Sequence, residues 1–317
     1  VNITNYDEPL QRVGGENNAF TNTDITNYYL TVPAANIETG FWLESDRMLS
    51  LSFDPQVLEV QRKVVIEEFK QRYLNQPYGD VWLKLRPLAY QNHPYQWATI
   101  DQVKQLSEKW FGSIPSGNKA QRKLPVEPVQ KEKRKATVSA NVPADALYMA
   151  WHMPGRFHND YYAFDLLSDI LSRGKSSRMY NELVKEKEIF SSVSSFVMGT
   201  VDPGMFVVSG RVKEGVSLAQ AEESVNVIIK KVIEEGVLEE ELQKVKNQAT
   251  STLAFGEVEV MNRAMNLAFA KLSGDADLVN KEAKMIEAVT IGDLQRVASD
   301  VLVESNSSVL YYDSINR

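Results

Sequence analysis

The fold of this chain is best predicted from one segment near its start, Gly14-Gly15-Glu16-Asn17-Asn18-Ala19-Phe20-Thr21, and from its continuation Asp24-Ile25-Thr26-Asn27-Tyr28-Tyr29-Leu30-Thr31-Val32. Residues 8–13 have helical spacing, and the glycine pair that follows interrupts it. Apolar and polar residues then alternate as they do in half-buried strands. The segment therefore predicts a short helix, a glycine turn and two strands.

Two helices are expected after these strands, at residues 37–48 and 55–73, because apolar residues recur there at helical spacing. The second helix has a start signal, since Asp54 is a common N-cap residue and Pro55 suits the first helical position. Helices and strands thus come in runs rather than in strict alternation. This order is typical of the α+β class.

A linker is predicted at residues 118–135. This stretch follows Pro115-Ser116-Gly117, contains Pro125 and Pro128, carries seven Lys or Arg residues and has little apolar periodicity. Its simplest interpretation is a solvated tether between a domain at residues 1–117 and a domain at residues 136–317. The second half repeats the order of the first, so we expect two related α+β domains, each with helices packed on one face of an antiparallel-rich sheet.

The expected elements of the second domain come from the same pattern rules. Strands are predicted at residues 137–142, 147–152, 191–198, 205–212 and 308–312. Helices are predicted at residues 161–171, 177–186, 218–235, 239–255, 260–272 and 291–301.

Composition excludes several classes of protein. The 317 residues are 43% hydrophobic and 24% charged, which is ordinary for a globular chain and unlike a disordered or collagen-like one. The net charge of −7 disfavours nucleic acid as a partner. No apolar run approaches the length of a membrane span, and the absence of cysteine removes disulfides and Cys-zinc sites. The compartment stays open between periplasm and cytoplasm, because either tolerates a chain without cysteine.

The three histidines give weak chemical signals. His93, His152 and His158 lack the spacing of a metal site, and the chain has no Gly-x-Ser-x-Gly, Walker A or Gly-x-Gly-x-x-Gly motif. His93 is expected in a turn, either on the surface or in a structural hydrogen bond. His152 is expected to be a satisfied histidine within a sheet.

One carboxylate lies on a predicted apolar helix face. Residues 61, 64, 65, 68 and 72 share that face, so Glu68 is grouped with Val64 and Val65, whereas Glu67 shares a face with Lys63 and looks solvated. A carboxylate on an apolar face must be paired, hydrogen-bonded or metal-bound. The residues alone favour a salt bridge for Glu68 over a metal.

The segments quoted at the outset resemble the pitrilysin/insulinase family (M16) of metallopeptidases. The resemblance continues through Glu44-Ser45-Asp46-Arg47-Met48, Gln61-Arg62-Lys63-Val64-Val65-Ile66-Glu67-Glu68, His93-Pro94-Tyr95 and Gly174-Lys175-Ser176-Ser177-Arg178-Met179-Tyr180. In size the chain is similar to the bacterial two-domain subunits that pair into a clamshell, like mitochondrial processing peptidase. The resemblance implies the LuxS/M16-like metallopeptidase fold and a homo- or heterodimer.

The resemblance also implies functions for named residues. Family enzymes bind zinc through a His-x-x-Glu-His helix plus a distant Glu, which Glu68 matches; the motif's Glu acts as the general base. An acidic residue is common seven positions earlier, where this chain has Gln61. The strand Asn18-Ala19-Phe20-Thr21 matches the edge that takes extended peptides or unfolded polypeptides by strand addition, although the residues alone also fit an ordinary interior strand.

The sequence departs from the family at two places. No His-x-x-Glu-His occurs between Val1 and Arg317, so two zinc ligands and the general base are missing from these residues; in the family they would lie just before Val1. The join at Ile100–Asp101 lacks a helix and a strand that the family usually has there. Zinc is therefore expected in a full-length protein and not in this chain, which is predicted to be inactive as written.

Three hypotheses follow from this resemblance. The favoured one is a parent zinc endopeptidase, the second is a non-catalytic partner subunit that binds peptides or forms the chamber wall, and the third is a scaffold that has lost peptide binding. A His-x-x-Glu-His encoded upstream would distinguish the first from the others. The family also uses an Arg and a Tyr of its second domain; Arg178, Tyr180 and Arg211 are of the right type, but none matches that pair residue by residue.

Overall fold

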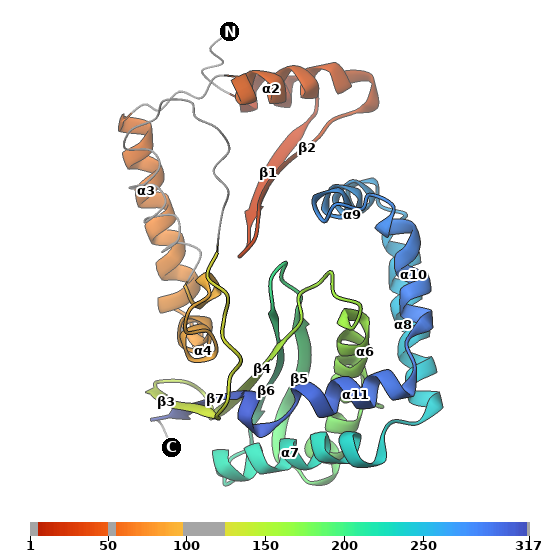
Figure 1. Cartoon of the computed structure of the whole chain (residues 1–317). Coiled ribbons are helices and arrows are strands. Elements are labelled where there is room, and N and C mark those ends of the chain that lie inside the picture. The colour runs from red at the N-terminus through yellow and green to blue at the C-terminus, as the bar shows by residue number, and fades with distance from the viewer. Residues whose placement is uncertain (1–5, 50–54, 98–123, 316–317) are drawn as a thin grey trace. The chain divides into compact units, whose positions relative to one another are not determined.

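The structure is a computed structural model that describes residues 6–49, 55–97 and 124–315 (Figure 1). The chain divides into two compact units. Unit 1 consists of Val1–Gly79 and Ala98–Gly117, and unit 2 consists of Asp80–Trp97 and Asn118–Arg317. Both units mix helices and strands, which confirms the α+β class.

Unit 1 contains the helix, glycine turn and two strands predicted from the opening segment. Its described elements are α1 (Asp7–Arg12), β1 (Glu16–Thr21), β2 (Thr26–Thr31), the 3₁₀ turn η1 (Ala34–Asn36), α2 (Ile37–Leu49), α3 (Pro55–Phe69) and the π-helical turn η2 (Lys70–Leu74). Strands β1 and β2 form an antiparallel pair.

The two glycines between α1 and β1 have different physical roles. Gly14 has a φ of +73°, which L side chains rarely adopt. Gly15 allows close packing, since a Cβ there would lie 2.6 Å from a side-chain atom of Leu10 and 2.8 Å from one of Val32. The glycine pair thus both turns the chain and lets α1 pack on the hairpin.

Unit 2 is built around a five-stranded sheet in the order β3-β7-β4-β6-β5. Strand β3 pairs with β7 in parallel, and the other neighbours are antiparallel. The strands are β3 (Arg134–Ala140), β4 (Ala146–Met153), β5 (Phe190–Met198), β6 (Gly204–Val212) and β7 (Ser307–Ser314). The helical elements are α4 (Val81–Ala89), η3 (Pro94–Gln96), α6 (Tyr161–Ser172), the π-helix η4 (Tyr180–Glu186), α7 (Leu218–Glu235), α8 (Glu239–Gly256), α9 (Val260–Leu272), α10 (Leu278–Ala288), α11 (Ile291–Val301) and η5 (Glu304–Asn306).

Helices cover both faces of this sheet. Alternate residues of β4 point to opposite faces. Leu147, Met149 and Trp151 lie in one hydrophobic core with residues of α6, α7 and α11. On the other face His152 contacts Tyr90, directly after α4, and α4 packs on β3, β4 and β7. The expectation of helices on one face is therefore too simple for unit 2.

Helix ends in unit 2 follow local sequence signals. Ser217 and Gln220 form a capping box at the start of α7, and Thr290 and Asp293 form one at the start of α11. Gly236, with a φ of +76°, follows the end of α7. These signals explain why the predicted ranges 218–235 and 291–301 agree with the structure.

Other predictions of local structure differ from the structure. Helices α4 and α10 were not predicted; α4 is short and has Pro87 inside it. The predicted helix at 177–186 is a π-helix over its last seven residues. The predicted boundary at residue 117 places residues 80–97 in the first domain, whereas in the structure they belong to unit 2. The join at Ile100–Asp101 lies outside the described residues.

The described part of the predicted linker is irregular and mostly exposed, but it is anchored to unit 2. Gln130 is buried, and its amide donates hydrogen bonds to the carbonyls of Glu132 and Ser307. The basic residue Arg134 already belongs to β3. In the part of the chain that the structure describes, no helix is long and apolar enough to span a membrane.

Candidate functional site

The predicted peptide-binding residues lie together on β1, which is exposed along its whole length. The backbone N–H of Asn22 donates to the carbonyl of Ile25 (2.9 Å), which closes a two-residue turn between the strands. Hydrogen-bonded and non-hydrogen-bonded pairs alternate in an antiparallel ladder. Given the register Ala19↔Tyr28 and Thr21↔Thr26, the backbone groups of Ala19 and Thr21 face away from β2.

One of these outward backbone groups is already hydrogen-bonded to a side chain of β1. The Oδ1 atom of Asn18 accepts a hydrogen bond from the backbone N–H of Ala19 at 2.8 Å. The side chain of Phe20 is 43% exposed. Among the described residues β1 has β2 as its one ladder partner, so its outer edge offers a row of main-chain donors and acceptors.

Strand β5, at one end of the unit 2 sheet, has a different kind of edge. The hydroxyl of Ser172, at the end of α6, accepts from the N–H of Ser195 (2.6 Å) and donates to its carbonyl (3.1 Å). The hydroxyl of Ser195 in turn donates to the carbonyl of Ser168 (2.8 Å). The centre of this edge is therefore already hydrogen-bonded to α6, unlike that of β1.

The structure contradicts the expectation that Glu68 lies on a buried apolar face. Its side chain is 54% exposed and forms an ion pair with Arg72 at 3.1 Å. Val64 and Val65 on the same face are also exposed. The salt-bridge interpretation of Glu68 is thus confirmed, and Glu67 is solvated as predicted, paired with Lys70 at 2.7 Å. The side chain of Gln61 lies outside the described residues.

The described residues do not provide a zinc site. No group of three or more His, Asp or Glu side chains in residues 6–49, 55–97 and 124–315 is arranged to hold a metal. Glu68 is one exposed carboxylate that is already paired with Arg72. A catalytic zinc needs three protein ligands and an open position, so the donor set of these residues does not fit the ion.

His93 is buried and has a structural role. Its Nδ1 accepts from the backbone N–H of Tyr95 (3.3 Å), and its Nε2 lies 3.3 Å from a carboxylate oxygen of Asp202. An accepting Nδ1 places the proton on Nε2, toward Asp202. The structural hydrogen bond is confirmed, and the surface-loop alternative is wrong.

The side chain of His152 forms fewer hydrogen bonds than expected. Its ring lies 4.9 Å from that of Tyr90, and its Nε2 is buried with no hydrogen-bond partner among the described residues. Burial holds the pKa of His152 below its usual value, although Glu127 opposes this effect. The ring is therefore neutral at pH 7.

Glu127 binds the backbone of residues 91–93 within unit 2. Its carboxylate accepts from the backbone N–H groups of Gln91, Asn92 and His93, at 2.8, 2.7 and 2.9 Å. Burial by itself raises the pKa of Glu127, but these three donors keep the net pKa below its usual value. No sequence signal pointed to this role of Glu127, because the residue lies in the stretch that was predicted to be a solvated tether.

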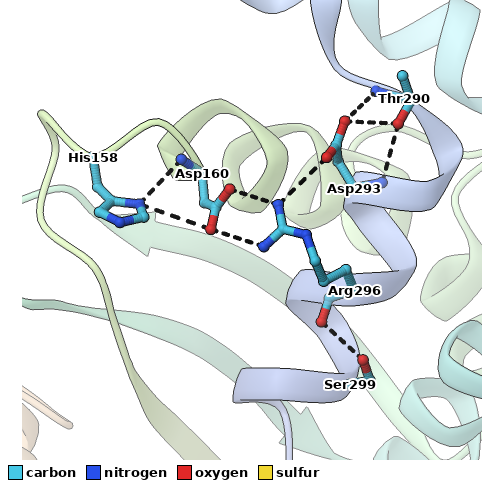
Figure 2. A network of polar contacts seen from close by, with 6 residues as sticks. All are labelled: His158, Asp160, Thr290, Asp293, Arg296 and Ser299. Carbon is cyan, nitrogen blue, oxygen red and sulfur yellow. Dashed lines mark hydrogen bonds and ion pairs between the residues drawn. The ribbon is translucent and has the colours of Figure 1, made fainter.

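A second polar network joins the loop before α6 to α11 (Figure 2). Arg296 binds both carboxylate oxygens of Asp160, at 2.6 and 3.0 Å, and also contacts Asp293 at 3.3 Å. His158 lies 3.8 Å from the same Asp160 carboxylate. The Arg296 guanidinium holds the pKa of Asp160 below its usual value. The nearby Ser299 hydroxyl bonds to the carbonyl of Arg296 and not to His158, so these residues are not arranged as a nucleophile and base.

Arg178 is also used structurally. Its guanidinium donates to both carboxylate oxygens of Glu241, at 2.6 and 2.8 Å, and to the carbonyl of Gly236 at 3.0 Å. Tyr180 opens the π-helix η4, and Arg211 lies near the end of β6. Met205 and Phe206, on the same strand as Arg211, are buried.

Two family models match the chain. Residues 2–101 match "Insulinase (Peptidase family M16)", and residues 98–249 match "Peptidase M16 inactive domain". Among curated proteins, "Zinc protease PqqE" of Helicobacter pylori is 24% identical, covering 96% of this chain and 78% of that protein. "Uncharacterized zinc protease YmxG" of Bacillus subtilis is 23% identical, covering 98% of this chain and 83% of that protein.

Solved structures show the same fold at low sequence identity. A protease from Helicobacter pylori has a TM-score of 0.84 at 23% identity, covering 97% of this chain and 84% of that one. A peptidase M16 inactive domain from Pseudomonas fluorescens has a TM-score of 0.78 at 14% identity, covering 98% of this chain and 83% of that one.

Proposed function

Because this chain belongs to the insulinase family of peptidases (peptidase family M16), we propose that it captures extended peptides along the outer edge of β1. The observation that carries the proposal is the outward main chain of Ala19 and Thr21 on an exposed strand. Strand addition uses main-chain hydrogen bonds, so it accepts many peptide sequences. The side chain of Asn18 occupies the Ala19 N–H in the free protein and would leave it when a peptide binds.

Peptide binding is tested by fluorescence anisotropy with an extended labelled peptide. Ala19→Pro removes an N–H that faces away from β2, so it should abolish binding while the β1–β2 pair remains. Asn18→Ala removes the internal competitor for that N–H and should tighten binding. A version of the peptide N-methylated at alternate residues should bind poorly, because methylation removes its main-chain donors. Equal binding of the methylated and unmethylated peptides would refute strand addition.

Zinc-dependent hydrolysis is the second candidate function, favoured by the zinc protease names of the relatives. The residues described do not fit a zinc ion by themselves, so the ligands of a His-x-x-Glu-His motif must come from outside these 317 residues, either in a longer polypeptide or in a partner subunit of the same fold. In such an assembly Glu68 would be the remaining protein ligand, and zinc would supply Lewis-acid activation of water.

The zinc proposal is tested by intact mass and elemental analysis of one sample. A mass above that of the 317 residues together with about one zinc per chain supports it, and Glu68→Gln should then release the metal while Glu67→Gln retains it. A mass equal to the printed sequence and no zinc, with peptide binding intact, supports a non-catalytic subunit. No peptide binding in either preparation would leave only a scaffold.

A further inference from the structure

A small cavity of unit 2 lies between α6, α9 and α10. Its volume is about 200 Å³. Its polar lining residues are Arg156, Tyr162, Asn266 and Glu282, and its apolar ones are Met265, Phe269, Ala270, Leu278 and Val279. This volume is below the ~300–1,000 Å³ typical of sites for drug-sized molecules, so a ligand would have to be smaller.

Arg156 presents unused hydrogen-bond donors to this cavity. Its guanidinium lies 5.2 Å from the ring centre of Phe269 and 5.5 Å from that of Tyr161, at cation–π distance. Its nearest carboxylate oxygen, on Glu282, is 3.9 Å away, which is too long for a hydrogen bond. No described residue accepts a hydrogen bond from the guanidinium, although it is 40% exposed and can bind water.

The loop that carries Arg156 is held at both ends. A Cβ on Gly155 would lie 2.3 Å from the carbonyl oxygen of Val201, so only glycine fits at this close approach of two backbones. The N–H of Arg156 donates to the carbonyl of Thr200 at 2.8 Å. At the other end of the loop, Asp160 is bound by Arg296 in the network of Figure 2. The backbone of Arg156 is thus held before any ligand binds, which lowers the cost of ordering this loop.

Glu282 supplies the opposite charge on the same cavity. Its carboxylate accepts from the hydroxyl of Tyr162 at 3.2 Å, and its side chain is 20% exposed. Burial and the Glu282 charge raise the pKa of Tyr162, so the phenol stays a hydrogen-bond donor. Arg156 and Glu282 therefore offer a cation and an anion side by side, next to an apolar wall.

We propose that this cavity binds a free α-amino acid with an apolar side chain. The ligand's carboxylate binds the guanidinium of Arg156, its ammonium binds the carboxylate of Glu282, and its side chain packs against Phe269 and Leu278. A ligand with only one charge could bind only one member of the Arg156–Glu282 ion pair, whose charged atoms lie 3.9 Å apart. The cavity is lined by residues of unit 2, and the proposal does not rest on the proposed peptide capture by β1.

The test is isothermal titration of the full chain with L-leucine, followed by two blocked derivatives. N-acetyl-L-leucine lacks the ammonium and L-leucinamide lacks the carboxylate, so each should bind at least tenfold more weakly than leucine, as expected when a charged hydrogen-bonding group is lost. These three titrations use the unaltered protein, so their outcome does not depend on whether a variant folds.

Two variants then test whether Arg156 and Glu282 bind the charged groups of the ligand. Arg156→Gln and Glu282→Gln should each weaken leucine binding at least tenfold. Arg263→Gln is the matched control, because that arginine lies on α9, is 65% exposed and does not line the cavity. No saturable binding of leucine, methionine or phenylalanine would overturn the proposal. So would binding of N-acetyl-leucine or leucinamide as tight as that of leucine.

Discussion

The carboxyl group of Asp165 on α6 should make unit 2 less stable as the pH rises through 6. Burial raises the pKa of Asp165 from 3.8 to about 6, with a further contribution from Asp169, and Arg156 and Arg173 oppose the shift only in part. No described residue donates a hydrogen bond to this carboxyl. Between the two pKa values the folded state therefore holds the proton and the unfolded chain does not, so the fold loses stability over that interval as the pH rises and the loss is complete above about pH 6.

The size of this effect follows from the shift in pKa. A difference of about two units, at ~1.4 kcal/mol per unit, corresponds to about 3 kcal/mol at pH 8. Asp165→Asn removes the titrating group while keeping its shape, so the variant should be about 2–3 kcal/mol more stable than the wild type at pH 8. The difference should shrink as the pH falls from 6 towards 4 and disappear below the unfolded pKa of 3.8, where the wild-type group is protonated in both the folded and the unfolded state.

The assay is urea unfolding at a series of pH values between 4 and 8, followed by tryptophan fluorescence, since Trp151 is buried in the unit 2 core. Asp300→Asn is the matched control, because Asp300 is an exposed aspartate on α11, and it should leave the stability close to that of the wild type at every pH. An Asp165→Asn variant that is destabilised at pH 8, or whose effect is independent of pH, would show that the ionised carboxylate is stabilised in the fold.

Three further predictions concern other parts of unit 2. Arg178→Lys should cost about 2–3 kcal/mol in urea unfolding, because a lysine cannot reproduce the two parallel bonds to Glu241; full stability of the lysine variant would contradict this. Glu127→Gln should cost about 2 kcal/mol at pH 7 and less at low pH, since a depressed carboxyl pKa stabilises the fold only while the group is ionised; a loss that does not vary with pH would count against it. Gly155→Ala should lower the melting temperature, because its Cβ meets the Val201 carbonyl; an unchanged melting temperature would show that this backbone contact can relax.

Helical periodicity identifies which residues share a face but not whether that face is covered. The sequence correctly grouped Glu68 with Val64 and Val65, and all three side chains are exposed in the structure. Burial depends on what packs against the helix, and that information lies elsewhere in the chain. The zinc-ligand role of Glu68 therefore stays a prediction.

The anchoring of the predicted linker was missed for a related reason. Composition described residues 118–135 well, since they are rich in proline and in basic residues. It could not indicate that Glu127 meets the N–H groups of residues 91–93, more than thirty positions earlier, or that Gln130 reaches Ser307. Contacts between residues so far apart depend on tertiary packing.

The sequence by itself determined the α+β class, the hairpin that contains Asn18 and Thr21, and the ends of α7 and α11, because glycine turns, strand alternation and capping boxes act over a few residues. Only the tertiary structure decided that α4 belongs to unit 2, that Ser172 binds the edge of β5 while β1 has no second ladder partner among the described residues, and that Arg156 and Glu282 lie side by side. These features depend on charges and hydrogen bonds between segments that are far apart in the sequence. A local sequence pattern does not identify which distant group will be the partner.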